Sequence, residues 1–203
     1  GQLTRNWQWL NTKTDANCHT ACVVKADGYG HGMNTIAFSL FEAGCRTFCV
    51  ARLEEALQLR FFLIQKNVGI DVVEIISFDG LQTSDFALYQ KYKIIPALKQ
   101  VSEIEFSINI ARTAAEKFPV WMQLDTGMNR LGISENELNS FFEESSINDM
   151  TGLDVKVVMS HLSCSDAPNH SANEKQRTRF IKMSKKFRTA SLSLSASHGL
   201  LIS

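Results

Sequence analysis

The sequence has few residues that forbid regular secondary structure and no surplus of charge. Proline occurs only three times in 203 residues, at Pro96, Pro119 and Pro168, so few points prevent a helix or strand from continuing. Twenty-one basic residues balance 21 acidic ones, whereas a nucleic-acid-binding protein carries a basic excess and attraction to an anionic membrane needs basic clusters. The composition therefore predicts a globular protein that binds neither nucleic acid nor a membrane.

Long apolar runs are also missing. No run approaches the roughly 20 apolar residues that cross a bilayer. The N-terminus lacks the basic segment followed by an apolar segment that marks a secretory signal. The chain begins Gly1-Gln2 without a methionine and stops on apolar residues, whereas natural termini are usually polar. We therefore expect part of a longer, cytoplasmic protein.

Cysteine is present in an odd number, which argues against a disulfide framework. The five are Cys18, Cys22, Cys45, Cys49 and Cys164. Without a secretory signal, free thiols are expected. The two C-x-x-x-C pairs fit structural zinc sites poorly, and a cysteine beside an apolar strand commonly acts as a small core residue. We predict no metal site.

Apolar runs rich in β-branched residues recur along the chain. They predict seven strands, over residues 21–25, 47–51, 72–77, 94–98, 120–125, 155–161 and 190–196. Several are apolar on successive residues, which is typical of strands covered on both faces in a parallel sheet. Helical spacing lies between them, over residues 53–63, 84–92 and 173–188, and capping-box sequences at Ser102 and Ser134 predict two further helix starts. This alternation is typical of an α/β fold.

The densest group of unusual residues is VVKADGYGHG, residues 23–32. A lysine at the end of an apolar strand is costly to bury in its charged form, and a neutral amine is a nucleophile that forms Schiff bases with aldehydes. The alternative is that Lys25 extends its amine into solvent. The glycines permit positive φ and close approach of a ligand. A phosphate-binding P-loop is excluded, because its lysine follows the glycines.

Polar clusters follow three other predicted strands. They contain Asp125 and Arg130, then His161, then Ser197. Carboxyl ends of strands in a parallel barrel meet at one mouth, where active sites lie. Each residue also has a structural alternative: His161 as a core imidazole, Arg130 as the loop partner of Asp125, and Ser197 as a helix cap. Their shared position predicts a site.

These motifs resemble those of the alanine racemases. VVKADGYGHG resembles the family's cofactor-lysine motif VVKANAYGHG, and MQLDTGMNRLGI resembles its K-x-D-T-G-M-x-R-L-G segment. VMSHLSCSD and SLSASHGLL resemble later strand ends, in the same order. The resemblance implies a (β/α)8 TIM-type barrel, incomplete here with about seven strands. Residues 1–203 would be its pyridoxal 5′-phosphate-binding domain, the N-terminal part of a larger enzyme whose C-terminal β domain is absent from this chain.

The resemblance also implies roles for individual residues. Lys25 would bind pyridoxal phosphate covalently and act as a catalytic base. Tyr29 and Ser197 would bind the phosphate, and His161 would lie against the pyridine ring. Arg130 would reach the phenolic oxygen and help to place the substrate carboxylate. The implied activity is the interconversion of L-alanine and D-alanine for peptidoglycan synthesis, by a homodimer.

Two departures from the family pattern change these expectations. Gln123 stands where many members have a lysine that becomes carbamylated, so no carbamylation is expected. The family's opposite-face tyrosine base lies in the C-terminal domain, so we expect the 203-residue chain alone to be inactive. Two alternatives remain: a homeostasis protein that binds pyridoxal phosphate without turnover, and a racemase for serine or another small amino acid.

Overall fold

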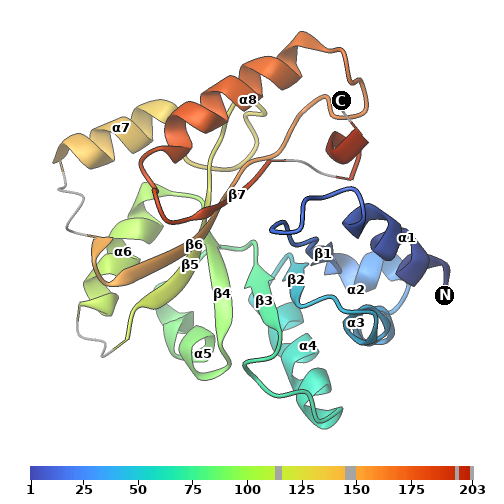
Figure 1. Ribbon diagram of the computed structural model, residues 1–203. Helices are drawn as coiled ribbons and strands as arrows, with labels where there is room; N and C mark the ends of the chain where they lie inside the picture. Colours follow the sequence, from blue (N-terminus) through green and yellow to red (C-terminus); the bar gives the residue numbers. More distant parts are fainter. Residues whose placement is uncertain (113–115, 145–149, 195–196, 202–203) are drawn as a thin grey trace. The chain divides into compact units, whose positions relative to one another are not determined.

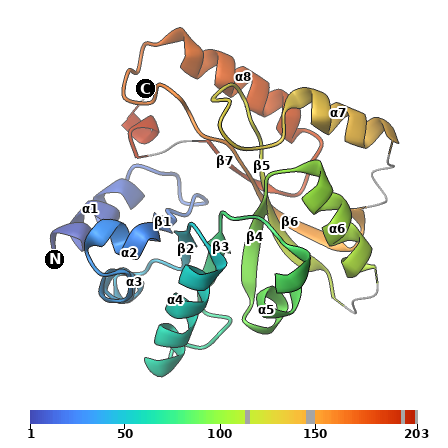
Figure 2. The same ribbon diagram turned by 180° about the vertical axis from the view of Figure 1, so that it is seen from behind.

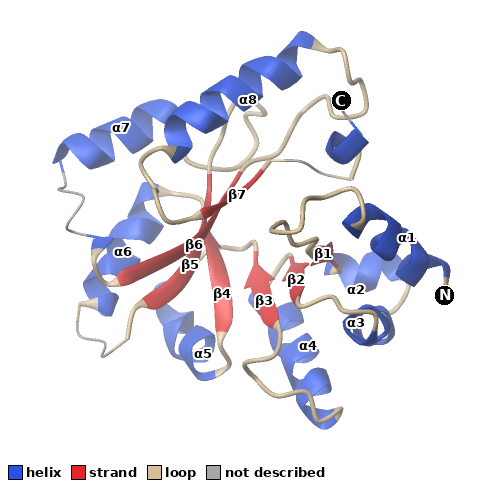
Figure 3. Ribbon diagram, in the orientation of Figure 1, coloured by secondary structure: helices blue, strands red, loops and turns tan. Residues whose placement is uncertain are grey.

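Strands and helices alternate along the chain. The computed structural model describes residues 1–203 except 113–115, 145–149, 195–196 and 202–203. Figure 3 shows the alternation of strands and helices. The strands are β1 (Cys22–Val23), β2 (Thr47–Val50), β3 (Glu74–Ser77), β4 (Ile94–Leu98), β5 (Phe118–Gln123), β6 (Leu153–Met159) and β7 (Ser191–Ser193). The helical segments are α1 (Gln2–Asn11), α2 (Lys25–Gly30), α3 (Met33–Glu42), α4 (Leu53–Gln65), η1 (Thr83–Asp85), α5 (Phe86–Lys91), α6 (Val101–Ala111), α7 (Glu135–Glu144), α8 (Ser171–Ser184) and η3 (Gly199–Leu201).

Every strand pairs in parallel with the next one along the chain. The order is β1-β2-β3-β4-β5-β6-β7, and all six pairings are parallel. A doubly wound sheet reverses its strand order at a switch point, whereas a β/α barrel adds its strands in sequence. The observed order is therefore that of a barrel, and Figure 1 shows the helices that connect the strands.

The chain divides into two compact units, residues 1–79 with 84–96 and residues 80–83 with 97–203. In the first unit, β2 and β3 supply fully buried residues such as Phe48 and Ile75, and α4 covers them with a buried stripe that includes Leu59 and Leu63. These apolar side chains recur at the spacing that places them on one face of a helix. The core of this unit is therefore the interface between sheet and helix.

Arg60 of α4 is buried in the first unit, with 1% of its surface exposed. Its guanidinium donates hydrogen bonds of 3.0 Å to the carbonyl oxygens of Val73, Tyr92 and Lys93. Burial lowers the pKa of Arg60 to about 10, against the opposing effect of Asp71, so the side chain stays charged at neutral pH. It ties α4 to the chain just before β3 and β4.

In the second unit, β5 and β6 form the longest pairing, with a register shift between Val120 and Trp121. Helices α7 and α8 lie side by side, in Figure 1 and again from behind in Figure 2. Glu135 of α7 lies 2.6 Å from the amine of Lys182 of α8. This ion pair lowers the pKa of Glu135.

The structure has a strand overlapping each of the seven predicted ranges, and β4 has the predicted bounds, whereas the bounds of the other six strands differ from those predicted. The predicted start of α7 is also confirmed, because Ser134 and Glu137 exchange the bonds of a capping box. The predicted capping box at Ser102 is wrong. The N-cap of helix α6 is Gln100, two residues before Ser102, and Glu103 instead accepts from the amide of Lys99 at 2.7 Å. Helices α1 and α3 were not predicted.

Two kinds of feature are absent from the described residues. No helix there is both apolar enough and long enough to cross a bilayer. In the same residues, no three histidine, cysteine or acidic side chains gather closely enough to hold a metal ion. The five cysteines are free thiols, of which Cys45 and Cys49 are buried.

Candidate functional site

Lys25 does not lie in the strand that was predicted to contain it. Strand β1 ends at Val23, and Lys25 begins a single turn of left-handed helix. The four residues from Ala26 to Tyr29 have φ between 51° and 63° and ψ between 39° and 52°. Left-handed helix costs roughly 1–2 kcal/mol per non-glycine residue, so surrounding contacts must hold this turn in place.

Two carboxylates supply those contacts. Asp27 accepts a hydrogen bond of 2.8 Å from the amide of Met33 at the start of α3. Glu55 of α4 accepts one of 2.7 Å from the amide of Ala26, and its second oxygen accepts from the amide of Ala51 at 2.8 Å. A negative charge at the N-terminus of a helix is stabilising. Asp27 and Glu55 therefore fix the backbone on both sides of the turn that follows Lys25.

Lys25 itself is half-buried. Within the described part of the chain its amine has no hydrogen-bond or ion-pair partner. The tip of the loop is open, because a Cβ atom built on Gly30 or Gly32 would meet nothing within 4 Å. Tyr29 is 59% exposed at the same turn. An uncommitted amine beside open backbone fits a bound aldehyde.

The second unit contains a recess at the carboxyl ends of β5 and β6. Its lining residues are Gln123, Leu124, Asp125, Met128, Arg130, Leu131, Ser160 and His161. The recess thus brings together two of the predicted site residues, Arg130 and His161. A guanidinium and an imidazole can bind an anionic oxygen and contact an aromatic ring. These donors fit a planar, anionic cofactor.

The loop that carries Arg130 is held by contacts between its own residues. Leu124 and Ile133 form an isolated parallel bridge. A Cβ on Gly132 would lie 2.7 Å from the amide nitrogen of Asp125, so only glycine fits there. Asp125 accepts hydrogen bonds from the amides of Gly127 and Asn129. Its carboxylate holds the loop through these amides, and no ion pair between Asp125 and Arg130 is present within the described residues.

Buried hydroxyls join this loop to the next one. Thr126 and Ser160 are 1% and 5% exposed, and their oxygens lie 2.8 Å apart. Ser160 also donates to the carbonyl of Leu124 at 2.7 Å. Gln176 of α8 contacts both loops, donating to Thr126 and to the carbonyl of His161. The turns after β5 and β6 therefore form one hydrogen-bonded body.

Ser197 lies in an exposed turn after β7, next to residues 195–196, which fall outside the described residues together with part of the predicted strand. Sequence reasoning did not identify Glu55 or Gln176. Glu55 stands in a run of helix-forming residues and Gln176 in a strongly basic segment. No local signal distinguished either residue from a solvated helix surface.

Comparisons with known proteins agree with the fold and the motifs. A family model described as the N-terminal domain of alanine racemase matches residues 1–203. The catabolic alanine racemase of Agrobacterium fabrum is 35% identical over 202 residues, which are 100% of this chain and 50% of that protein. The alanine racemase of Brucella ovis is 36% identical over 174 residues, 86% of this chain and 42% of that protein.

A solved alanine racemase structure also matches this chain. The alanine racemase of Bartonella henselae, described as having covalently bound pyridoxal phosphate, matches with a TM-score of 0.88 and 32% identity over 99% of this chain and 56% of that one. The fold is thus the expected incomplete TIM-type α/β barrel. The chain spans about half the length of the curated relatives it matches. It belongs to the alanine racemase family and corresponds to the N-terminal domain of that family.

Proposed function

We propose that this chain is the pyridoxal phosphate-binding domain of an isomerase that interconverts L-alanine and D-alanine. The observation that carries the proposal is Lys25, whose uncommitted amine opens a left-handed turn within the cofactor-lysine motif. Support comes from the alanine racemase of Bartonella henselae, a structural match described as holding covalently bound pyridoxal phosphate. Residues 1–203 would form one barrel domain of a longer protein.

Bound pyridoxal phosphate would supply an electron sink that makes the Cα proton of an amino acid acidic. Lys25 would hold the cofactor and then take or return that proton at Nζ, on one face of the substrate. Tyr29 and Ser197 would donate hydrogen bonds to the phosphate. Both side chains are exposed and each follows the carboxyl end of a strand, where barrels bind their ligands.

Arg130 and His161 would orient the cofactor and the substrate from their common recess. Arg130 is exposed and has no partner among the described residues, so its guanidinium can contact a phenolic oxygen and a substrate carboxylate. His161 would lie against the ring. Gln123 lines the same recess and carries no charge, so it would offer Arg130 a neutral amide oxygen in place of a negative partner.

Several properties of the whole protein are part of this proposal. Because the chain spans half the length of its relatives, we expect racemisation to need the remaining half, and the 203-residue chain alone to be inactive. The active form would be a cytoplasmic homodimer. D-alanine would serve peptidoglycan synthesis. The name of the Agrobacterium relative favours a second candidate role, alanine catabolism.

Chemical trapping tests the role of Lys25. The protein would be incubated with pyridoxal phosphate and reduced with borohydride, and the modified peptide would be identified by mass spectrometry. We expect a single label on Lys25 and no stable label in Lys25→Ala. Label on surface residues such as Lys185 and Lys186, with Lys25 unmodified, would refute the proposal.

Activity tests the reaction and separates the alternatives. The full-length protein should convert L-alanine to D-alanine, detected with a D-amino-acid oxidase coupled assay. Faster turnover of serine would move the substrate assignment to that amino acid. Trapping at Lys25 without turnover of any amino acid by the full-length protein would indicate a cofactor-homeostasis protein. Robust turnover by residues 1–203 alone would contradict the proposed need for a further domain.

A further inference from the structure

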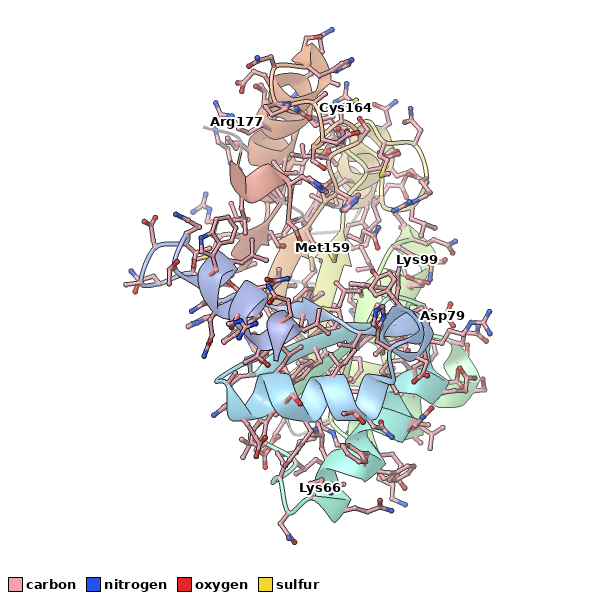
Figure 4. All side chains as sticks on the ribbon, turned by 90° about the vertical axis from the view of Figure 1, so that its right-hand side faces the viewer. Lys66, Asp79, Lys99, Met159, Cys164 and Arg177 are labelled. Atoms are coloured by element: carbon pink, nitrogen blue, oxygen red, sulfur yellow. The ribbon has the colours of Figure 1, made fainter. Side chains whose placement is uncertain are left out.

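We infer that Gln176 is a positioning residue that fixes the Arg130 loop and the His161 loop relative to each other. The Arg130 loop is residues 124–133, after β5, and the His161 loop is residues 160–164, after β6. The inference rests on the proposed function, in which Arg130 and His161 contact the cofactor. Gln176 lies in the middle of α8, and Figure 4 labels its neighbour Arg177 together with Cys164 of the His161 loop.

Gln176 has partners in both loops. Its Nε2 donates to Thr126 Oγ1 at 3.1 Å, in the Arg130 loop, and to the carbonyl oxygen of His161 at 2.9 Å. Its Oε1 accepts from the amide and the hydroxyl of Ser163, both at 2.9 Å. The carbonyl of His161 and the amide of Ser163 flank Leu162, so one side chain holds both ends of the turn that follows His161.

These four bonds exhaust the capacity of a primary amide, which has two N–H donors and an oxygen with two lone pairs. Gln176 is 3% exposed, and burying an amide without partners costs free energy, so this complete set of partners is what stabilises it there. No other residue of similar length supplies two donors and two acceptor sites. Asparagine is one methylene shorter, and glutamate has no donors at neutral pH.

Neighbouring residues on α8 hold single loops, which sets Gln176 apart. Arg179 donates to the carbonyl of Thr126 at 3.0 Å, in the Arg130 loop alone. Asn173 donates to the carbonyls of Cys164, Ala167 and Pro168, on the His161 side alone. Among these three, Gln176 is the residue that couples the two loops. Its loss should therefore change the separation of Arg130 and His161, beyond loosening either loop.

The test compares Gln176→Met and Gln176→Glu with the exposed control Lys175→Ala in the full-length protein. Met keeps the length but removes all four bonds, and Glu keeps the acceptors for Ser163 but removes both donors. A misplacement of about 1 Å in a site costs on the order of 100-fold. We therefore expect both variants to lower kcat/KM for alanine by about 10- to 100-fold, with a shift in the absorption maximum of the bound cofactor. Lys175→Ala should be unchanged.

Two readouts do not depend on activity. The 1H–15N signals of the His161 imidazole, recorded without cofactor, should shift in Gln176→Met and stay in place in Lys175→Ala. Melting temperatures identify a variant that merely fails to fold. In that case Thr126→Val, which removes one acceptor and leaves the amide buried, provides the test. If Gln176 acts through Thr126, then Gln176→Glu should lower kcat/KM by a smaller factor in Thr126→Val than it does in the wild type.

The experiment distinguishes failure of the Gln176 inference from failure of the proposed function. A wild-type protein that binds no pyridoxal phosphate, yet shows the His161 shift in Gln176→Met, would remove the proposed function and retain Gln176 as the coupling residue. Normal kcat/KM, an unshifted cofactor spectrum and unshifted His161 signals in folded Gln176→Met would overturn the inference. Fully additive effects of Gln176→Glu and Thr126→Val on the logarithm of kcat/KM would also overturn the inference.

Discussion

The two units hold their site loops by different physical means. In the first unit, a strained left-handed turn after Lys25 is fixed by the carboxylates of Asp27 and Glu55. In the second, the loops after β5 and β6 are joined to each other by neutral hydroxyl and amide groups, among them Thr126, Ser160 and Gln176. The carboxylate of Asp125 acts within one of these loops, where it accepts from the amide of Asn129, a residue with a φ of 56°. Hydrogen bonds to charged groups contribute about twice as much as neutral ones. Stronger partners are therefore found where the backbone needs more stabilisation.

The largest effect should come from Glu55. Its two oxygens accept from the amides of Ala26, Ala51 and Arg52. Glu55→Ala leaves those amides without a carboxylate, and we expect it to lower the free energy of unfolding by about 2–3 kcal/mol and to slow trapping at Lys25. Urea denaturation and the borohydride experiment measure the two effects.

Glu54→Ala is the matched control, since Glu54 is exposed beside Glu55 on the same helix turn. If Glu54→Ala and Glu55→Ala lower the unfolding free energy equally, the Glu55 carboxylate has no special stabilising role. The contrast between the two units then loses its main support.

How far the sequence predicts this arrangement depends on the range of the interactions. The seven strands follow from local apolar runs, and the start of α7 follows from Ser134 and Glu137, which are three residues apart. The left-handed turn could not be predicted, because Ala26 and Tyr29 disfavour it and a residue 29 positions away from Ala26 holds it. The same applies to Gln176, which bonds Thr126 across 50 residues.

A smaller effect is expected for Asp27. Replacement by alanine removes the acceptor for the amide of Met33 and the negative charge at the start of α3. Loss of such a cap costs roughly 1–2 kcal/mol. Asp27→Asn retains an acceptor oxygen and should recover most of the unfolding free energy measured by denaturation. Equal losses in the two variants would show that the charge, and not the hydrogen bond, holds the turn.

In the second unit, Ser160→Ala should cost less unfolding free energy than Glu55→Ala and no more than Asp27→Ala. It removes the bonds to Thr126 and to the carbonyl of Leu124, which are neutral and contribute about 1 kcal/mol each or less. We expect a loss of about 1–2 kcal/mol in unfolding free energy. A loss larger than that of Glu55→Ala would reverse the comparison between the units.

The smallest effect should be pH-dependent and come from Glu137. Hydrogen bonds from the Ser134 hydroxyl and amide lower the pKa of this carboxyl. A lowered folded-state pKa means that the stabilisation is present above the unfolded value of about 4.3 and is lost as pH falls through the folded value.

Because Glu137 is exposed, Glu137→Gln should cost only about 0.5 kcal/mol at pH 7. The difference from wild type, measured by denaturation, should shrink as the pH falls below 4. If the difference in unfolding free energy instead grew as the pH fell, the ionised Glu137 carboxylate would not be the stabilising cap.

The handedness of the turn after Lys25 has a consequence for chemical synthesis. D-residues favour left-handed φ and ψ. In an L-residue with these angles Cβ lies too close to the following carbonyl oxygen, and inverting the configuration at Cα removes this clash. A semisynthetic protein with D-alanine at position 26 would keep the same atoms and relieve the conflict present in the genetically encoded chain. For this one turn, the enantiomer of the encoded residue is the better building block.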